Sequence, residues 1–349
     1  MTLYFLNEYK LFKKLSFYAI KSTYIFANYI TLNLMKILFH TNQINFRGTT
    51  VAIADYAKYN QEILGNESVI GYNSDIMNIE DGKTEFDALN YLKKYFELRP
   101  YKFIEIDRSL SDIDFAYFLR AGNNEPTPKS VRSGVHAVFQ YNEPHGDVYA
   151  YISKWLSCKM SDSLLPYVPH IVTLPEPKKN YRSFLNIKPE QVVIGRLGGL
   201  TTFDIPFVKE AIIEIVKANN KFVFLFLNTK PFISHPNIKY INAVVDPQQK
   251  SDFINTCDGF VHARQQGESF GLAICECLLL NKPVLAFNGG IDRHHIDLLQ
   301  KTDLLYDREN VKEKLLSITD FKRDWKELVE EFNPKDTMKK FQDVFLKGL

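Results

Sequence analysis

The sequence predicts an α/β protein of two doubly wound domains, each built on a mostly parallel sheet. From Lys36 onward, short apolar runs alternate with segments of helical periodicity, as in strands joined by crossover helices. The alternation begins again at Gln191, after a stretch that contains three prolines. A chain of 349 residues is long enough for two domains with separate cores. Hydrophobic content of 45% and charged content of 24% are typical of a soluble globular protein.

The first domain is expected over residues 35–175. Its first strand is Lys36–His40, followed by a polar loop and a helix from about Thr49 to Leu64, and a second helix is expected over Asp147–Leu156. The other candidate strands are Ser68–Tyr72, Phe103–Ile106, Phe115–Leu119, Val135–Phe139 and His170–Leu174. Residues 176–189, rich in proline and charge, are interpreted as the connection between the domains.

The second domain is expected over residues 190–325. Its helix Pro206–Ala218 carries apolar side chains at helical spacing. Six strands with interleaved helices indicate the doubly wound arrangement, and the candidates are Gln191–Gly195, Phe222–Leu227, Lys239–Ala243, Gly259–His262, Val284–Phe287 and Leu304–Tyr306. Residues 326–349 are expected to form closing helices, broken at Asn333-Pro334.

Residues 1–34 are rich in aromatic and aliphatic side chains and carry several lysines. Lys21 interrupts any run long enough to span a bilayer, and no small-residue cleavage site follows an apolar core. Three interpretations stay open: a basic, aromatic helix on a membrane or on the protein body, a disordered extension, or translation upstream of the usual start. The first would make the protein peripheral at a membrane.

Charge and cysteine content exclude several function classes. A net charge of +2 provides no field for binding nucleic acid. The four cysteines, at positions 158, 257, 275 and 277, form no CxxC motif and no disulfide framework. Reduced thiols and a cytoplasmic protein are therefore expected.

The stretch GESFGLAICE is the most informative in the chain, because it holds two carboxylates, Glu268 and Glu276, between two predicted strands. The carboxyl edge of a parallel sheet is where open α/β sheets bind ligands, and a helix start there suits a phosphate. Eight helical residues rise about 12 Å, so both Glu would lie on nearly one face and hold the two ends of an elongated ligand. The alternative is an amphipathic helix with a capping carboxylate and one solvated Glu.

This stretch resembles the E-x7-E signature of retaining glycosyltransferases with the GT-B fold, in particular family 4. The likeness runs from about Met35 to the C-terminus and is strongest from Gln191 to Asp297. It implies two Rossmann-like domains that face a cleft, with the donor mainly on the second, the acceptor mainly on the first and the last helix crossing back. By resemblance, Glu268 lies near the transferred sugar and Glu276 binds the nucleotide ribose; the intervening donor-site residues are Ser269, Phe270 and Gly271.

Two regions of the first domain carry further candidates. Arg47 and Gly48 lie in the loop before a helix, where backbone can approach an anion closely; a plain βα turn is the alternative. His136 matches a histidine found near the transferred sugar in family 4, although a lone histidine in a strand is more often a hydrogen-bonded core residue. His145 reaches the cleft in this interpretation, or is an exposed loop residue.

In the second domain, Arg196 and Gly198 follow a strand in a position where similar enzymes bind the diphosphate with an Arg and a Lys five residues later. This chain has Thr201 at the position of that Lys. We expect Arg264 to supply the missing charge, and His262 to contact the ligand or pack on the neighbouring strand.

No metal or other cofactor is expected. Asp112 and Asp114 spell DxD, but they precede an apolar strand and are interpreted as residues of the loop that leads into it. His294 and His295 are adjacent on a helix, so they point in different directions and lack a third ligand.

The resemblance implies a metal-independent glycosyltransferase that moves a sugar from a nucleoside diphosphate sugar to an acceptor with retention of configuration. The acceptor stays open as a glycan, lipid or protein. One alternative is a sugar-nucleotide epimerase or phosphorylase-like enzyme on the same fold. The other is an inactive nucleotide-binding subunit, which the missing Lys favours.

Overall fold

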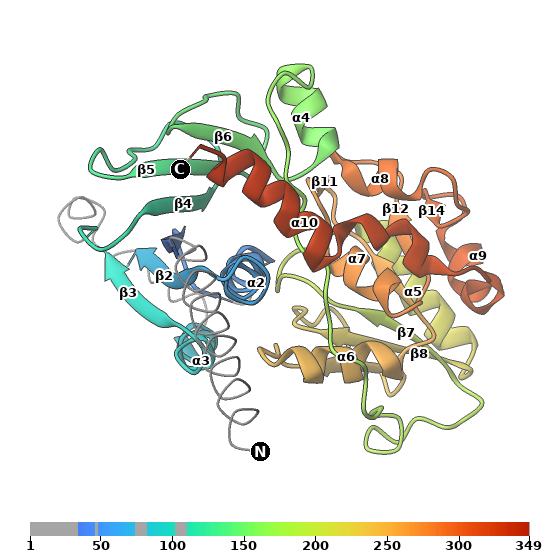
Figure 1. The fold of residues 1–349 in the computed structure, drawn as a ribbon. Coiled ribbons are helices and arrows are strands. Elements are labelled where there is room, and N and C mark those ends of the chain that lie inside the picture. The colour runs from blue at the N-terminus through green and yellow to red at the C-terminus, as the bar shows by residue number, and fades with distance from the viewer. Residues whose placement is uncertain (1–33, 46–47, 74–81, 102–109, 349) are drawn as a thin grey trace, which may run out of the picture.

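Two parallel sheets with helices around them form the protein (Figure 1). The computed structural model describes residues 34–45, 48–73, 82–101 and 110–348. The first lobe is the sheet from β1 (Lys36–Thr41) to β6 (Val148–Tyr151) with its helices, and the second lobe is the sheet from β7 (Val192–Arg196) to β14 (Leu305–Tyr306) with its helices. Predicted strand Phe103–Ile106, Arg47 and residues 1–33 lie outside the described residues, so the expectations for them stay predictions.

The first sheet has the strand order β3-β2-β1-β4-β5-β6, with all neighbours parallel. This is the doubly wound order, in which the chain starts at the centre and builds outward in both directions. The strands are β1 (Lys36–Thr41), β2 (Glu67–Asn73), β3 (Glu97–Tyr101), β4 (Phe115–Arg120), β5 (Arg132–Ala137) and β6 (Val148–Tyr151), and the helices are α2 (Gly48–Glu62), α3 (Gly82–Leu92) and α4 (Lys154–Ser161).

The first lobe departs from the sequence expectations in three places. The helix expected over Asp147–Leu156 is wrong: β6 pairs with β5 there, and Ser153 caps a later helix by accepting a hydrogen bond from Leu156 N. The expected strand His170–Leu174 joins no sheet; Val172 N instead donates to Phe332 O at 2.8 Å. β3 was not expected, and its Pro100 is tolerated because β3 is an edge strand.

The second sheet repeats the same order, β14-β12-β10-β7-β8-β9, and its six predicted strands are confirmed with small shifts in their ends. Its strands are β7 (Val192–Arg196), β8 (Phe222–Leu227), β9 (Ile238–Ile241), β10 (Gly259–His262), β12 (Val284–Phe287) and β14 (Leu305–Tyr306). The helices are α5 (Pro206–Ala218), α6 (Pro247–Thr256), α7 (Leu272–Leu279), α8 (His294–Leu299) and α9 (Val311–Leu316). A separate parallel pair joins β11 (Gly267–Glu268) to β13 (Asp292–Arg293).

The tail of the chain returns from the second lobe to the first, as expected (Figure 1). Short helical turns lead into α10 (Pro334–Phe341), which begins at the predicted break after Asn333. Phe341 then packs against Tyr56 and Tyr117 of the first lobe at ring-centroid distances of 5.3 and 5.2 Å, and Phe345 packs against Tyr117 at 5.3 Å. The turns of the tail are η3 (Ile318–Asp320), η4 (Trp325–Leu328), η5 (Glu330–Phe332) and η6 (Gln342–Leu346).

Candidate active site at the junction of the two lobes

The loops that follow the carboxyl ends of first-lobe strands touch the second lobe near β11 and α7. A Cβ added at Gly48, the first residue of α2, would lie 3.9 Å from Leu272, the first residue of α7. Gln140 Nε2, after β5, donates to Asp292 Oδ1 at 2.7 Å. Ser153 Oγ donates to Ser269 O at 2.7 Å. The two carboxyl edges, where doubly wound sheets bind ligands, therefore meet at this junction.

Glu268 lies at this junction on β11 and is held by two basic side chains. His262 Nε2 lies 2.9 Å from Glu268 Oε1, and Arg264 Nη1 donates to Oε2 at 3.1 Å. Burial alone would raise the pKa of Glu268, but the hydrogen bond from His262 and the charges of His262 and Arg264 lower it to about 2. Glu268 is therefore a carboxylate throughout the physiological pH range, and the structure brings the three expected residues together.

The backbone around Glu268 is fixed by glycines. Gly267 has φ +81°, and a Cβ there would meet Asp292 O at 2.0 Å, because β11 and β13 pair at this point. Gly271, with φ +83°, is the N-cap of α7. Glu268 thus precedes the helix instead of lying on it, which corrects the expectation that both Glu share one helical face.

Glu276 is on α7 and forms a buried ion pair that the sequence did not predict. Lys250 Nζ, from α6, lies 2.7 Å from Glu276 Oε1, and the two side chains are 14% and 3% exposed. Burial raises the pKa of Asp55, on α2 of the first lobe, to about 7, while nearby Lys250 lowers it and Glu276 raises it. The Glu276 end of the junction therefore contains a cation and a second carboxyl group. Lys250 is separated from Glu276 by 26 positions, so no local motif signals it.

Arg196, at the end of β7, is 3% exposed and is surrounded by oxygens of the protein. Its Nη1 donates to Asn228 O at 2.8 Å and Thr229 Oγ1 at 2.7 Å. Its Nη2 donates to Gly199 O at 2.8 Å and Thr202 Oγ1 at 2.7 Å. Burial lowers the pKa of Arg196 to about 10, and the charges of Glu268 and Asp204 raise it. Arg196 orders the loops after β7 and β8, and we revise its expected role accordingly.

Gly198 belongs to the loop that Arg196 orders. A Cβ there would lie 2.9 Å from Arg196 Nη2, and Gly198 O accepts a hydrogen bond from Asn228 Nδ2 at 3.0 Å. Thr201, at the position of the Lys in similar enzymes, is exposed on the same loop. The loop is thus built without the second positive charge.

His136 is a core residue of the first lobe, which corrects the expectation that it contacts the sugar. It is 0% exposed on β5, and both ring nitrogens have partners: Tyr117 OH lies 2.6 Å from Nδ1, and Tyr151 O lies 3.1 Å from Nε2. Burial lowers its pKa to about 4. Phe345 of the tail packs on its ring at 5.4 Å. His145 lies in the loop between β5 and β6, where Nδ1 is 2.7 Å from Glu143 O.

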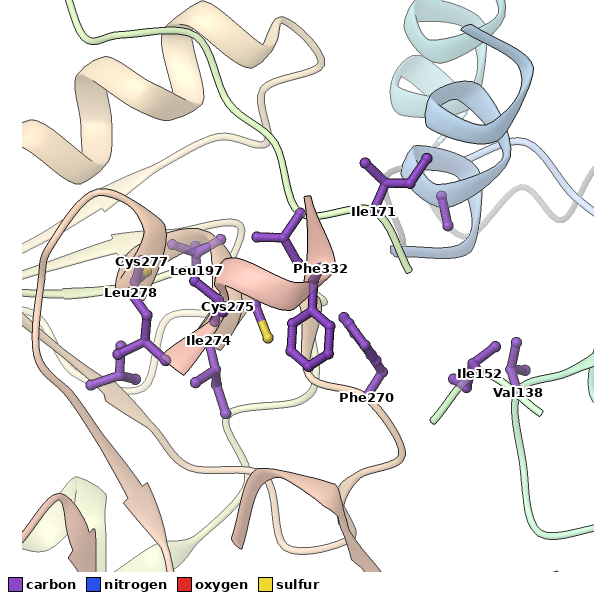
Figure 2. Packing of buried hydrophobic residues seen from close by; sticks show 14 of the residues in the cluster. Val138, Ile152, Ile171, Leu197, Phe270, Ile274, Cys275, Cys277, Leu278 and Phe332 are labelled. Carbon is purple, nitrogen blue, oxygen red and sulfur yellow. The ribbon is translucent and has the colours of Figure 1, made fainter. Parts of the chain in front are cut away.

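Phe270 and Ser269 join the lobes instead of leaving a free surface. The Phe270 ring stacks on His294 at 5.1 Å and meets His170 edge-on at 5.1 Å. Figure 2 shows Phe270 beside Phe332, whose ring centroid is 5.2 Å away. Ser269 O receives the hydrogen bond from Ser153 described above. These residues fix the approach to α7 against the first lobe.

Asp112 and Asp114 lie at the amino edge of the first sheet, away from the junction. Asp112 accepts from Arg99 Nη1 and Nη2 at 2.8 and 2.7 Å, and Asp114 Oδ2 accepts from Lys36 N at 2.7 Å. They are residues of the loop that leads into β4, as predicted. In the described part of the chain, no group of three or more His, Cys, Asp or Glu side chains is arranged to hold a metal ion.

Among the described residues, no helix combines the length and the apolar character needed to cross a bilayer.

Solved structures are similar to this chain in fold. The first is HepE (Alr3699) from Anabaena in complex with UDP and glucose, with a TM-score of 0.67 and 13% identity over 90% of this chain and 100% of that one. A glycosyltransferase from Rickettsia africae has a TM-score of 0.63 and 13% identity over 91% and 100%. A Listeria monocytogenes protein, provisionally identified as a UDP-N-acetylglucosamine 2-epimerase, has a TM-score of 0.54 and 12% identity over 89% and 95%.

No protein-family model matches the chain, and no curated protein is similar to it in sequence. At 11 to 13% identity, the likeness to solved structures concerns the fold alone. This chain has two doubly wound lobes of six parallel strands each, and the likeness in fold to those structures extends over 90% and 91% of it. The chain has the GT-B fold of glycosyltransferases.

Proposed function

We propose that the protein is a glycosyltransferase that binds a nucleoside diphosphate sugar at the junction of its lobes. The observation that carries this proposal is the placement of Glu268 and Glu276 on either side of the amino end of α7. One carboxylate precedes the helix and the other lies inside it, so they bracket the position where backbone N–H groups are free. A diphosphate over that position would leave its sugar near Glu268 and its ribose near Glu276.

The amino end of α7 would stabilise the diphosphate that leaves during transfer. Its free N–H groups and positive dipole end favour negative charge, and they are fixed before the reaction begins. Arg264 lies beside Glu268, and Lys250 lies beside Glu276. We propose that Arg264 and Lys250 supply the positive charge for the diphosphate that a lysine in place of Thr201 would otherwise supply. Arg196 acts through the loop that it orders.

Glu276 would accept hydrogen bonds from the ribose hydroxyls. Lys250 occupies Oε1, so ribose would bind to Oε2 or displace Lys250 from the carboxylate. Glu268 would accept hydrogen bonds from hydroxyls of the transferred sugar, because its low pKa keeps it ionised. We further propose retention of configuration, no requirement for a metal ion, and a cytoplasmic location in keeping with the free thiols of buried Cys257, Cys275 and Cys277.

The test is donor binding and transfer by wild-type protein, Glu276→Ala and Glu276→Gln. A thermal-shift screen against UDP, GDP, ADP and their common sugars identifies the donor, since a ligand raises the apparent stability by mass action. Glu276→Gln should weaken binding of the nucleotide about tenfold or more, because ribose loses a charged acceptor. Transfer by Glu276→Ala at the wild-type rate would refute the ribose role.

A sugar-nucleotide epimerase is the second candidate, because the Listeria protein provisionally identified as such shares the fold. An epimerase would convert the donor without an acceptor, so product analysis in the absence of acceptor separates the two activities. An inactive subunit would bind nucleotide in calorimetry and turn over no donor with any acceptor.

A further inference from the structure

The carboxyl edge of the first sheet holds three buried polar atoms that have no hydrogen-bond partner among the residues the structure describes. They are His40 Nδ1 on β1, Asn42 Oδ1 just after β1, and Arg120 Nε at the end of β4. His40 and Arg120 are 2% and 3% exposed. Such atoms are uncommon in folded proteins, because each has lost its hydration without a replacement.

These atoms belong to one compact cluster. The Arg120 guanidinium lies 4.1 Å from the centre of the Phe118 ring, and the His40 ring lies 5.2 Å from it. Glu125 Oε2 accepts from Asn42 Nδ2 at 3.3 Å and lies 3.5 Å from Arg120 Nε. Because the Asn42 amide nitrogen faces this carboxylate, its oxygen points to the other side.

The cluster lies between two contacts of the lobes. β4 is located between β1 and β5 in the sheet. The helix after β1 touches the second lobe through Gly48 and Leu272, and the loop after β5 touches it through Gln140 and Asp292. The end of β4 therefore lies at the carboxyl edge of the first sheet, between the two segments that contact the second lobe. A second substrate would have to enter between the lobes here in order to reach the donor.

The chemistry of the cluster favours a neutral ligand with many hydroxyl groups. Glu125 compensates the charge of Arg120, so an anionic group would meet a carboxylate. Burial lowers the pKa of His40 to about 3, so its imidazole is neutral and has one donor and one acceptor nitrogen. A sugar hydroxyl both donates and accepts, which suits donors and acceptors that alternate over a short distance.

We propose that His40, Asn42, Arg120 and Glu125 form a saccharide subsite that holds the acceptor. Its role as the acceptor site rests on the proposed glycosyl transfer, whereas the binding of a neutral saccharide does not. The loop with Glu125 is held in place from the β5–β6 side, since Asn124 N donates to Glu143 Oε2 at 2.8 Å.

The experiment measures binding of methyl glycosides of glucose, galactose, mannose and N-acetylglucosamine by saturation-transfer NMR. Methyl glucuronide is the anionic probe. At least one neutral glycoside should bind to the full-length protein. Its Kd should rise about tenfold or more in Asn42→Leu, which removes the amide, and in Glu125→Gln, which keeps the shape and removes the charge. Asn124→Leu, an exposed position on the same loop, is the control and should stay within twofold of the wild-type Kd.

The proposal is overturned if no neutral glycoside binds, if the glucuronide binds more tightly than every neutral probe, or if both site variants keep the wild-type Kd. Glu125 is on a loop and 17% exposed, so Glu125→Gln remains informative even where Asn42→Leu does not fold. Nucleotide binding by the same wild-type protein is measured in parallel. If the wild-type protein binds a glycoside but no nucleotide, and the variants lose the glycoside, the result supports the subsite and refutes the proposed transfer.

Discussion

At the scale of single residues, chemistry alone did not decide which polar side chains are functional. His136 and His262 both follow apolar strand residues, and the sequence favoured a site role for each. The structure buries His136 with both nitrogens satisfied, but places His262 against a carboxylate. The difference depends on which side chains the neighbouring strands and the tail bring to each ring, and these are remote in sequence.

His136→Gln should therefore lower stability and leave the chemistry of the folded protein intact. The change leaves the buried Tyr117 hydroxyl without its 2.6 Å partner, which costs about 1–3 kcal/mol. Urea unfolding and transfer rates measured on the same preparation check this. The matched change His145→Gln, in a loop, should leave the urea midpoint at its wild-type value. A His136→Gln protein of full stability whose transfer rate falls more than a hundredfold would show that the core assignment is wrong.

The proposed donor site could be predicted only in part. The spacing of Glu268 and Glu276 and the adjacent Gly271 are local, so the motif predicted them. Lys250 is on another helix, α6, and only the tertiary fold brings its ammonium within 2.7 Å of Glu276. In the sequence, Lys250 looks like any other lysine, because its carboxylate partner Glu276 is 26 positions away.

At the scale of elements, the short pair β11–β13 fixes the position of Glu268. Gly267→Ala should destabilise the protein by roughly 2–4 kcal/mol, because a Cβ would meet Asp292 O at 2.0 Å at a residue with φ +81°. The control is Gly48→Ala, where the nearest atom to an added Cβ is 3.9 Å away. Calorimetric unfolding of both variants checks the prediction, and equal stability would contradict the role of the pair.

Elements with strong local patterns were predicted, and elements that depend on tertiary pairing were not. Most strands of the second lobe, such as β7 and β8, are buried apolar runs, as central parallel strands are, and all six strands were found. In β6, the run Val148–Tyr151 is only four residues long and precedes a true helix, so the periodicity of the helix was extended over it. Its pairing with β5 outweighed that local pattern.

At the scale of the whole molecule, buried histidines should make the protein sensitive to acid. Burial lowers the pKa of His40 to about 3 and that of His136 to about 4, and it also lowers the pKa of His295, to about 4, and of His170, well below its usual range. The histidines of the unfolded chain bind protons near pH 6.5, whereas the buried histidines of the folded protein stay neutral there. The contribution of these histidines to stability is therefore complete above pH 6.5. It is lost as the pH falls toward 4.

For His136 alone, the fall in pKa from 6.5 to about 4 corresponds to about 3 kcal/mol. Asp55 acts in the opposite direction, because its pKa is raised to about 7 and its contribution is lost as the pH rises from about 4 to 7. Burial lowers the pKa of His294 as well, so with five histidines against one carboxyl group the urea midpoint should fall steadily between pH 6.5 and 4. A midpoint that stays constant over this interval would contradict the burial of the histidines.

The central claim is that the junction of the lobes binds an activated sugar by its diphosphate, with one carboxylate at each end. A crystal structure of the protein soaked with the nucleotide sugar found in the thermal-shift screen tests this directly. We expect the diphosphate over the amino end of α7, a ribose hydroxyl within hydrogen-bond distance of Glu276 and the sugar within reach of Glu268. Nucleotide bound elsewhere, with both carboxylates remote from it, would contradict the claim.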